Sequence, residues 1–189
     1  LQHMFDPKSV VLIGASQQAG SVGNWLARNL VQGFRGRVEF VNPKGGTIEG
    51  KTCHRGLAKL DEPADLAVVV TPASTLPGII AELGAAGTRA AVVISAGVNG
   101  ELRQAMLDAA KPFCLRILGP NCIGLALPHI GLNATFSHIA APKGDLAFLS
   151  QSGALITGIV DWASSRAIGF SQVVSLGDMA DVDFGDLVD

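Results

Sequence analysis

The stretch that decides the fold is Ser9-Val10-Val11-Leu12-Ile13-Gly14-Ala15-Ser16-Gln17-Gln18-Ala19-Gly20-Ser21-Val22-Gly23. Its first five residues are mostly β-branched and apolar, which predicts a buried strand. The residues that follow are rich in Gly and Ser and lead into a segment of helical period. Free backbone N–H groups and a helix N-terminus then meet at one point, which favours binding of a phosphate. The alternative is a plain strand–helix turn without a ligand.

The same alternation of apolar runs and helical segments continues along the chain. Further strands are expected over 38–41, 66–70, 90–94 and 115–118, and helices over 22–31, 76–86 and 101–110. Strands that are apolar throughout and separated by helices are typical of a parallel sheet covered on both faces. The fold class is therefore α/β.

The pattern divides the chain into two units. We expect a first domain over residues 5–142, in which 124–142 lack periodicity and form an irregular excursion or linker. A second α/β unit over 143–189 follows, with a strand at 145–149, a helix at 153–166 and a strand at 170–176.

Both ends of the sequence carry signals of their own. Residues 1–4 resemble a cloning remnant and are left out of the predicted fold. Asp181-Val182-Asp183 predicts the entry to a helix, because Asp is favoured at the cap and in the first turn. We expect the chain to be the front of a longer protein, with a short native helix as the alternative.

Composition narrows the function. Fourteen basic residues against 16 acidic ones and 5% aromatic residues argue against a nucleic-acid partner. Pro and Asn interrupt the longest uncharged stretch, 117–142, so no membrane span is expected. The three Cys form no CxxC pair, which indicates reduced thiols in a cytoplasm rather than disulfides or a metal site.

Candidate ligand-binding residues follow the predicted strands, since ligands of open parallel sheets bind beyond the carboxyl ends of the strands. The second strand is followed by Asn42-Pro43-Lys44, where a nicotinamide dinucleotide site would offer an acid. A cation there suits a ligand that carries phosphate, although a solvated Lys is the alternative. The third, fourth and fifth strands are followed by Thr71-Pro72, Ser95-Ala96-Gly97 and Gly119-Pro120-Asn121-Cys122.

Other residues admit a catalytic and a structural interpretation. Cys122 could be a nucleophile, but no base is adjacent in the sequence. Ser152-Gly153 opens the helix of the second unit, which predicts an anion site; a plain helix cap is the alternative, and the GxSxG glycines of a hydrolase are absent. His54, His129 and His138 lack metal-ligand spacing and are expected on the surface or in loops.

Seven motifs in order resemble one family: Ile13-Gly14-Ala15-Ser16, Ser21-Val22-Gly23, Val41-Asn42-Pro43-Lys44-Gly45-Gly46, Gly119-Pro120-Asn121-Cys122-Ile123-Gly124, Gly131-Leu132-Asn133-Ala134-Thr135-Phe136, Ser150-Gln151-Ser152-Gly153-Ala154 and Ser175-Leu176-Gly177-Asp178. Together they are similar to the N-terminal part of NDP-forming acyl-CoA synthetases, relatives of the succinyl-CoA synthetase α subunit. The resemblance implies a Rossmann-like CoA-binding domain followed by the start of a flavodoxin-like domain.

The resemblance also implies roles for residues. Ser16, Gly20 and Ser21 would line the CoA phosphate loop, and Lys44 would meet a phosphate. Asn121 would lie near the thiol end, and Ser152-Gly153 would hold the phosphate of a phosphohistidine. The residues expected to border CoA or acyl-CoA between these points are Thr71, Pro72, Ser95, Ala96 and Gly97.

The family's phosphorylated His has no counterpart in these 189 residues, and neither has its ATP-grasp domain. No catalytic residue is therefore expected here, and the chain alone is expected to be inactive. ATP or ADP and Mg²⁺ would bind only to an ATP-grasp domain, elsewhere in the same chain or in a β subunit. The expected function is the CoA-binding portion of an acetyl-CoA-type synthetase. The alternatives are a CoA-sensing domain of a protein-lysine acetyltransferase fusion and, less favoured, a nicotinamide dehydrogenase.

Overall fold

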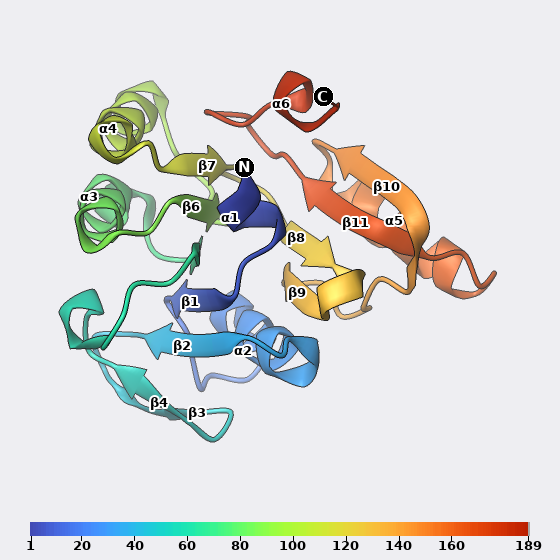
Figure 1. Ribbon diagram of the computed structural model, residues 1–189, viewed down its shortest axis with the longest axis horizontal. Coiled ribbons are helices and arrows are strands. Elements are labelled where there is room, and N and C mark those ends of the chain that lie inside the picture. The colour runs from blue at the N-terminus through green and yellow to red at the C-terminus, as the bar shows by residue number, and fades with distance from the viewer. Residues whose placement is uncertain (189) are drawn as a thin grey trace.

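The computed structural model describes residues 1–188, which form two sheets flanked by helices (Figure 1). The helices are α1 Gln2–Phe5, α2 Val22–Gly33, α3 Leu76–Ala86, α4 Gly100–Ala110, α5 Gly153–Ser164 and α6 Phe184–Val188. The first sheet contains β1 Ser9–Ile13, β2 Arg37–Val41, β3 Gly46–Ile48, β4 Lys51–His54, β5 Leu66–Val69, β6 Ala90–Val93 and β7 Arg116–Leu118. The second contains β8 Gly124–Leu127, β9 Leu132–Thr135, β10 Lys143–Ser150 and β11 Phe170–Ser175.

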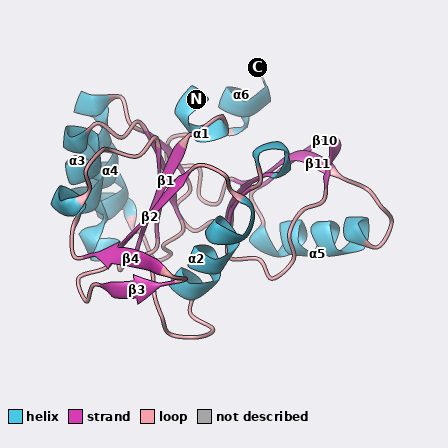
Figure 2. Ribbon diagram, turned by 60° about the horizontal axis from the view of Figure 1, so that its bottom comes forward, coloured by secondary structure: helices cyan, strands magenta, loops and turns pink. Residues whose placement is uncertain are grey.

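The first sheet has the strand order β3-β4-β2-β1-β5-β6-β7, and all its pairs except β3 with β4 are parallel. Every residue of β1, β5 and β6 is buried, as uninterrupted apolar runs predict. Helices α3 and α4 cover one face and α2 covers the other (Figure 2). The predicted α/β fold is confirmed.

The turn from β1 into α2 depends on close backbone packing. Gly14 has a φ of +95°, and a Cβ there would lie 2.2 Å from the Val70 carbonyl oxygen. A Cβ on Gly23 would lie 2.1 Å from the Gly14 carbonyl oxygen. Only glycine allows α2 to begin this close to the end of β1, so both positions fix how the loop is held.

The hairpin of β3 and β4 was not predicted. Its tight turn places Glu49 at φ 46° and Gly50 at φ 75°, the two positive values of a type I′ turn. β4 pairs with β2 and thereby extends the sheet. The signal was present, since Thr47-Ile48 and Thr52-Cys53 flank the Gly-containing turn, but the strands are too short to show a period.

The prediction that 124–142 form an irregular excursion is wrong. β8 and β9 pair with each other, and β8 pairs antiparallel with β11, so the second sheet has the order β10-β11-β8-β9. Leu125 and Leu132 share one apolar cluster with Val10 and Leu26, which joins the two sheets into a continuous core. Periodicity failed because the Gly- and Pro-flanked strands are only four residues long. The boundary at residue 142 stays a prediction.

The N-terminal residues depart from the expectation, whereas a helix does begin directly after Asp183 as predicted. Residues 1–4 are not outside the fold: α1 begins at Gln2, and Met4 is completely buried in the core of the first sheet. The last helix begins at Phe184, with the Asp183 side chain accepting from Gly185 N–H at 2.7 Å. The burial of Met4 has a simple reason: an apolar side chain is more stable in the core than in water, even close to the end of the sequence.

Asp181 is not part of this helix cap. Its carboxylate accepts from the guanidinium of Arg116 at 3.0 Å and from Ile117 N–H at 2.7 Å. Partial burial acts to lower the pKa of Arg116, but hydrogen bonds and charge from Asp181 and Asp186 raise it above its usual value. Asp181 thus connects the last part of the chain to β7.

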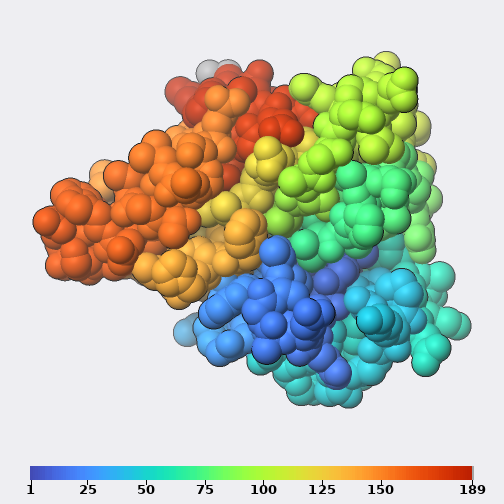
Figure 3. Space-filling view, turned by 180° about the vertical axis from the view of Figure 1, so that it is seen from behind, coloured from blue at the N-terminus to red at the C-terminus, as the bar shows by residue number. Residues whose placement is uncertain are grey.

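The outer part of the second sheet extends away from the first. Figure 3 shows the region of α5, β10 and β11 projecting from the rest of the molecule.

Candidate functional site

Two adjoining hollows lie where β1, β2 and β5 end. The larger has a volume of about 470 Å³, and the smaller has about 200 Å³. Ser16 and Asn42 line both, so the hollows meet at these residues. The strand order changes direction beside β1, and open parallel sheets bind ligands at such a point.

The loop between β1 and α2 carries backbone N–H groups without acceptors, and its residues 15–18 line the smaller hollow. Among the described residues 1–188, the N–H groups of Gln17, Ala19 and Gly20 have no acceptor. Gly20 has a φ of +78°, and a Cβ there would meet nothing within 4 Å. These donors and the N-terminus of α2 make the loop suited to an anion.

Ser16 and Ser21 have structural roles in this loop. The Ser21 hydroxyl caps α2 by accepting from Asn24 N–H at 3.3 Å, and it donates to the Gln18 carbonyl at 2.7 Å. The Ser16 hydroxyl accepts from Gln18 N–H at 3.0 Å. Both side chains therefore shape the loop, and its backbone supplies the free donors.

Lys44 lies next to the loop, and its exposed side chain lines the smaller hollow with Ser16. Asn42 joins the two segments: its amide donates to the Ala15 carbonyl at 2.9 Å and accepts from Lys44 N–H at 2.9 Å. A carboxylate at this position could still accept from Lys44 N–H, but it would leave the Ala15 carbonyl without its donor. The structure thus gives the physical reason why an acid is missing here.

The ends of β5, β6 and β7 are joined in a row of polar contacts. Thr71 N–H donates to the Ser95 hydroxyl at 3.1 Å, and that hydroxyl donates to the Thr71 carbonyl at 2.6 Å. Asn121 N–H donates to the Ser95 carbonyl at 3.0 Å. Thr71 and Pro72 line the larger hollow, whereas Ser95 is buried and its hydroxyl is fully occupied. Ala96 and Gly97 are exposed.

The N-terminus of α5 lies against the turn that contains Asn121. A Cβ on Gly153 would lie 2.4 Å from Cγ2 of Ile123, two residues after Asn121. The Ser152 hydroxyl accepts from Leu155 N–H at 3.2 Å, which makes it the cap of the helix. The structure thus brings Ser152-Gly153 against the turn that follows β7, two residues from Asn121, although sequence reasoning placed them in separate units.

The nucleophile interpretation of Cys122 is wrong. Its thiol is buried and lies 3.4 Å from the Val93 carbonyl oxygen. Burial raises the pKa of Cys122 to about 12, so the thiol stays protonated and unreactive.

The three histidines noted in the sequence have different surroundings. His54 contacts Glu39 at 3.3 Å and His129 contacts the Ser171 carbonyl at 3.2 Å, while His138 is exposed. No group of three metal-ligating side chains occurs among residues 1–188.

Sequence reasoning missed several residues that line the larger hollow. Arg55 follows β4, and its guanidinium is brought to the site by the hairpin that was not predicted. Glu82 lies on α3 and faces the same hollow together with Thr75 and Ile79. A signal existed only for Arg55, through the turn at Glu49-Gly50; the others reach the site through helix packing.

Comparison with known proteins gives the family. A CoA binding domain matches residues 8–128, and a succinyl-CoA ligase like flavodoxin domain matches residues 143–189. The chain belongs to the CoA binding domain family. The CoA ligand and the order of a Rossmann-like domain followed by a flavodoxin-like one, both predicted from the sequence, are thereby confirmed. The comparisons do not favour the alternative of a nicotinamide dehydrogenase domain.

Relatives of this CoA binding domain protein are ligases. It is 41% identical over its whole length to ADP-forming acetate–CoA ligase I of Archaeoglobus fulgidus, of which it covers 28%. It is 38% identical to the α subunit of ADP-forming acetate–CoA ligase I of Pyrococcus furiosus, of which it covers 43%. The chain therefore spans less than half of these relatives, and it is similar to the α portion of ADP-forming acetyl-CoA synthetases.

A solved structure gives the same result. Dinucleotide forming acetyl-coenzyme A synthetase 1 of Ca. Korarchaeum cryptofilum in its apo form superposes with a TM-score of 0.94 at 35% identity, over 99% of this chain and 42% of that one. None of these three relatives is named an acetyltransferase, so the comparisons do not favour the fusion alternative. Among residues 1–188, no helix combines the length and hydropathy that crossing a membrane requires.

Proposed function

We propose that this protein holds CoA or acyl-CoA along the carboxyl ends of β1, β2, β5, β6 and β7, as the CoA-binding part of an ADP-forming acyl-CoA synthetase. The observation that carries this proposal is the pair of joined hollows: Gln17 and Lys44 line the smaller one, and the free N–H groups of Ala19 and Gly20 belong to the same loop. A diphosphate needs such donors and a cation. A Cβ added at Gly20 would project into open space, which leaves room for a phosphate at this point of the loop.

The parts of CoA are assigned along the row of strand ends. The loop of Ser16, Gly20 and Ser21 and the Lys44 ammonium bind phosphate oxygens. The larger hollow, whose walls include Ile13, Val70 and Ile79, suits the flat apolar face of adenine, with Arg55 at its rim. The arm then passes Thr71, Pro72, Ser95, Ala96 and Gly97, and its thiol end reaches Asn121.

Beside Asn121, the N-terminus of α5 provides a second anion site. We propose that Ser152 and Gly153 stabilise a phosphoryl group there, through backbone N–H groups and the helix dipole. In the whole protein, a phosphohistidine would deliver that group, and an ATP-grasp domain, in the same chain or a β subunit, would bind ADP or ATP with Mg²⁺. The whole protein would be an acid–thiol ligase of acetate–CoA type in the cytoplasm, which accords with three free thiols among residues 1–188.

Calorimetric titration of the 189-residue chain tests the proposal. CoA and acetyl-CoA are expected to bind, and NAD to bind far more weakly, because no acid follows β2. Tighter binding of NAD than of CoA would contradict the assignment. The chain alone is also expected to make no ATP from ADP, phosphate and acetyl-CoA, and label on His54, His129 or His138 would contradict that expectation.

A further inference from the structure

The motif Ser175-Leu176-Gly177-Asp178 has no role in the site described so far, yet it lies directly on that site. Gly177 has a φ of +57°, and a Cβ there would lie 2.1 Å from the Pro120 carbonyl oxygen and 2.8 Å from that of Asn121. Asp178 N–H donates to the same Pro120 carbonyl at 2.9 Å. The turn after β11 therefore packs backbone to backbone against the turn after β7.

The side chains continue this contact. The Asn121 amide nitrogen Nδ2 donates to Oδ1 of Asp178 at 3.1 Å. Asn121 itself is held in the left-handed region at φ 57°, and its N–H donates to the Ser95 carbonyl. Both the backbone and the side-chain amide of Asn121 thus have a fixed orientation. Asp178, 57 positions along the chain, sets the orientation of the amide.

This contact decides which end of the amide faces solvent. A carboxylate only accepts hydrogen bonds at neutral pH, so Asp178 selects the orientation in which Nδ2 faces it. Oδ1 of Asn121 then points away from Asp178, and no described residue in 1–188 donates to it. The exposed Asn121 side chain accordingly offers an acceptor at the strand ends.

We propose that Asp178 is a positioning residue of the CoA site, which presents Oδ1 of Asn121 as an acceptor to the pantetheine arm. The inference rests on the proposed function, which places the thiol end of CoA at Asn121. The arm carries amide N–H groups and a thiol S–H, all of which are donors. Without Asp178 the amide can turn over, and Nδ2 would then face the arm without an acceptor.

The test compares two ligands that differ in the arm. Adenosine 3′,5′-bisphosphate contains the nucleotide end of CoA and lacks pantetheine. Asp178→Ala is expected to weaken CoA binding about threefold to tenfold, the effect of one hydrogen bond. Its affinity for the bisphosphate is expected to stay within about twofold of wild type, because the Gly14–Gly23 loop and Lys44 are untouched.

A double-mutant cycle separates positioning from general structural damage. Asn121→Ala is expected to weaken CoA binding by a similar factor, and Asp178→Ala added to it is expected to have less than about a twofold further effect. Asp178→Asn can both accept from Nδ2 and donate to Oδ1, so it no longer selects one orientation and is expected to recover only part of the CoA affinity. Asp108→Ala, which removes an exposed charge on α4, is the matched control and is expected to bind like wild type.

Three outcomes would overturn the inference. One is equal weakening of both ligands by Asp178→Ala, and another is a full effect of Asp178→Ala in the Asn121→Ala background. The third is unchanged CoA affinity in Asp178→Ala. A wild-type chain that binds neither ligand would instead contradict the proposed function itself, and a wild type that binds only the bisphosphate would contradict the placement of the arm.

Discussion

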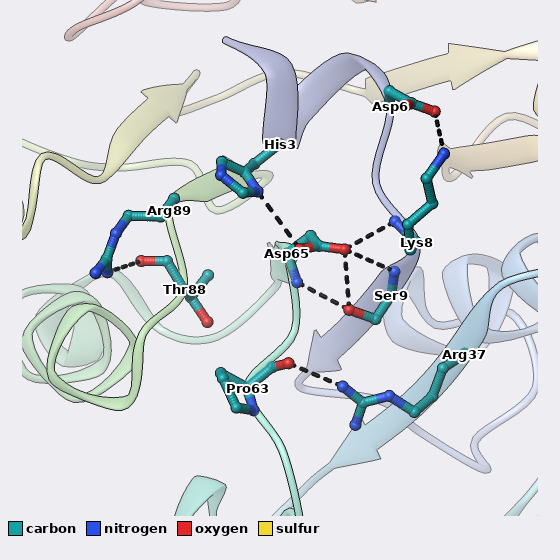
Figure 4. Close-up of polar contacts among 9 residues, drawn as sticks. All are labelled: His3, Asp6, Lys8, Ser9, Arg37, Pro63, Asp65, Thr88 and Arg89. Atoms are coloured by element: carbon teal, nitrogen blue, oxygen red, sulfur yellow. Dashed lines mark hydrogen bonds and ion pairs between the residues drawn. The ribbon is translucent and has the colours of Figure 1, made fainter.

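Polar groups at the amino ends of the first sheet and in the loop at its carboxyl ends differ in whether they have hydrogen-bond partners within the chain. At the amino ends of the strands, Asp65 accepts from Lys8 N–H at 2.8 Å, from Ser9 N–H at 3.1 Å and from the Ser9 hydroxyl at 3.2 Å. His3 of α1 approaches the other oxygen at 3.4 Å (Figure 4). At the carboxyl ends, by contrast, the N–H groups of Gln17, Ala19 and Gly20 have no acceptor among residues 1–188.

This difference separates stability from binding. Polar groups that are satisfied within the chain hold strands together and have little left to offer a ligand. Free N–H groups around a hollow contribute nothing to the fold until a ligand accepts from them. Substitutions at the amino ends are therefore expected to change stability alone, and those at the carboxyl ends to change binding, unless they alter the backbone.

The largest expected effect is that of Gly14→Ala. The new Cβ combines a left-handed backbone with a clash against the Val70 carbonyl, so the free energy of unfolding should fall by about 3 kcal/mol or more. Urea denaturation measures it. Gly20→Ala is the matched control, since its φ is also positive but its Cβ meets nothing within 4 Å; it should lose only about 1–2 kcal/mol. Equal losses would show that the close approach is unimportant.

Asp65→Ala comes next. It leaves two strand-end N–H groups and the Ser9 hydroxyl without their acceptor, and we expect a loss of about 2 kcal/mol in the free energy of unfolding. CoA affinity should be unchanged, because the site lies at the other end of the sheet. The control is Asp61→Ala, an exposed carboxylate nearby, with a change within about 0.5 kcal/mol. A drop in CoA affinity that matches the drop in stability would remove the contrast between the two ends.

Lys44→Ala tests the carboxyl end. A charge-assisted hydrogen bond to phosphate contributes about 1.5–3 kcal/mol, so CoA should bind about tenfold more weakly or worse. The melting temperature without ligand should stay constant, because the side chain is exposed. Calorimetry and thermal denaturation give both quantities, with Lys111→Ala as the control for loss of one positive charge. Unchanged affinity would mean that Lys44 is only a solvated surface charge.

The smallest expected effect is a pH dependence at Asp65. Partial burial acts to raise the pKa of Asp65, but hydrogen bonds from Lys8, Ser9 and His3 outweigh it and hold the pKa below its usual 3.8. The stabilisation is therefore complete above about that pH and is lost as the pH falls through the lower, folded-state value. The difference in unfolding free energy between wild type and Asp65→Asn should narrow below pH 4. A difference that widens on acidification would contradict the lowered pKa.

Some parts of the site could be found in the sequence because their signals are local. We identified the loop after β1, Lys44 and the helix start at Ser152 from residues within a few positions of one another. Arg55 could have been found through the Gly-containing turn of the β3–β4 hairpin, whereas Glu82 and the contact of Asp178 with Asn121 could not be found from local signals. Each of the latter two depends on elements that are distant in sequence, and no local pattern states which of them pack together.

What the sequence determined by itself is the set of long apolar strands, the glycines that follow them and the helix starts. Uninterrupted runs such as Ser9–Ile13 and Leu66–Val69 form strands in any context that buries both faces, and Gly14 is required by the backbone it adopts. Family membership also followed from motifs alone, since the order of seven short motifs is written in the chain.

Only the tertiary structure decided which segments that are distant in sequence pack against one another. Gly124–Leu127 becomes a strand because β11 and β9 lie beside it, and Met4 becomes core because the first sheet leaves an apolar space for it. Cys122 is unreactive because the turns around it exclude water. In each case the stabilising contact is made with residues far along the chain. Its free energy therefore depends on the completed packing, and the local sequence carries no record of it.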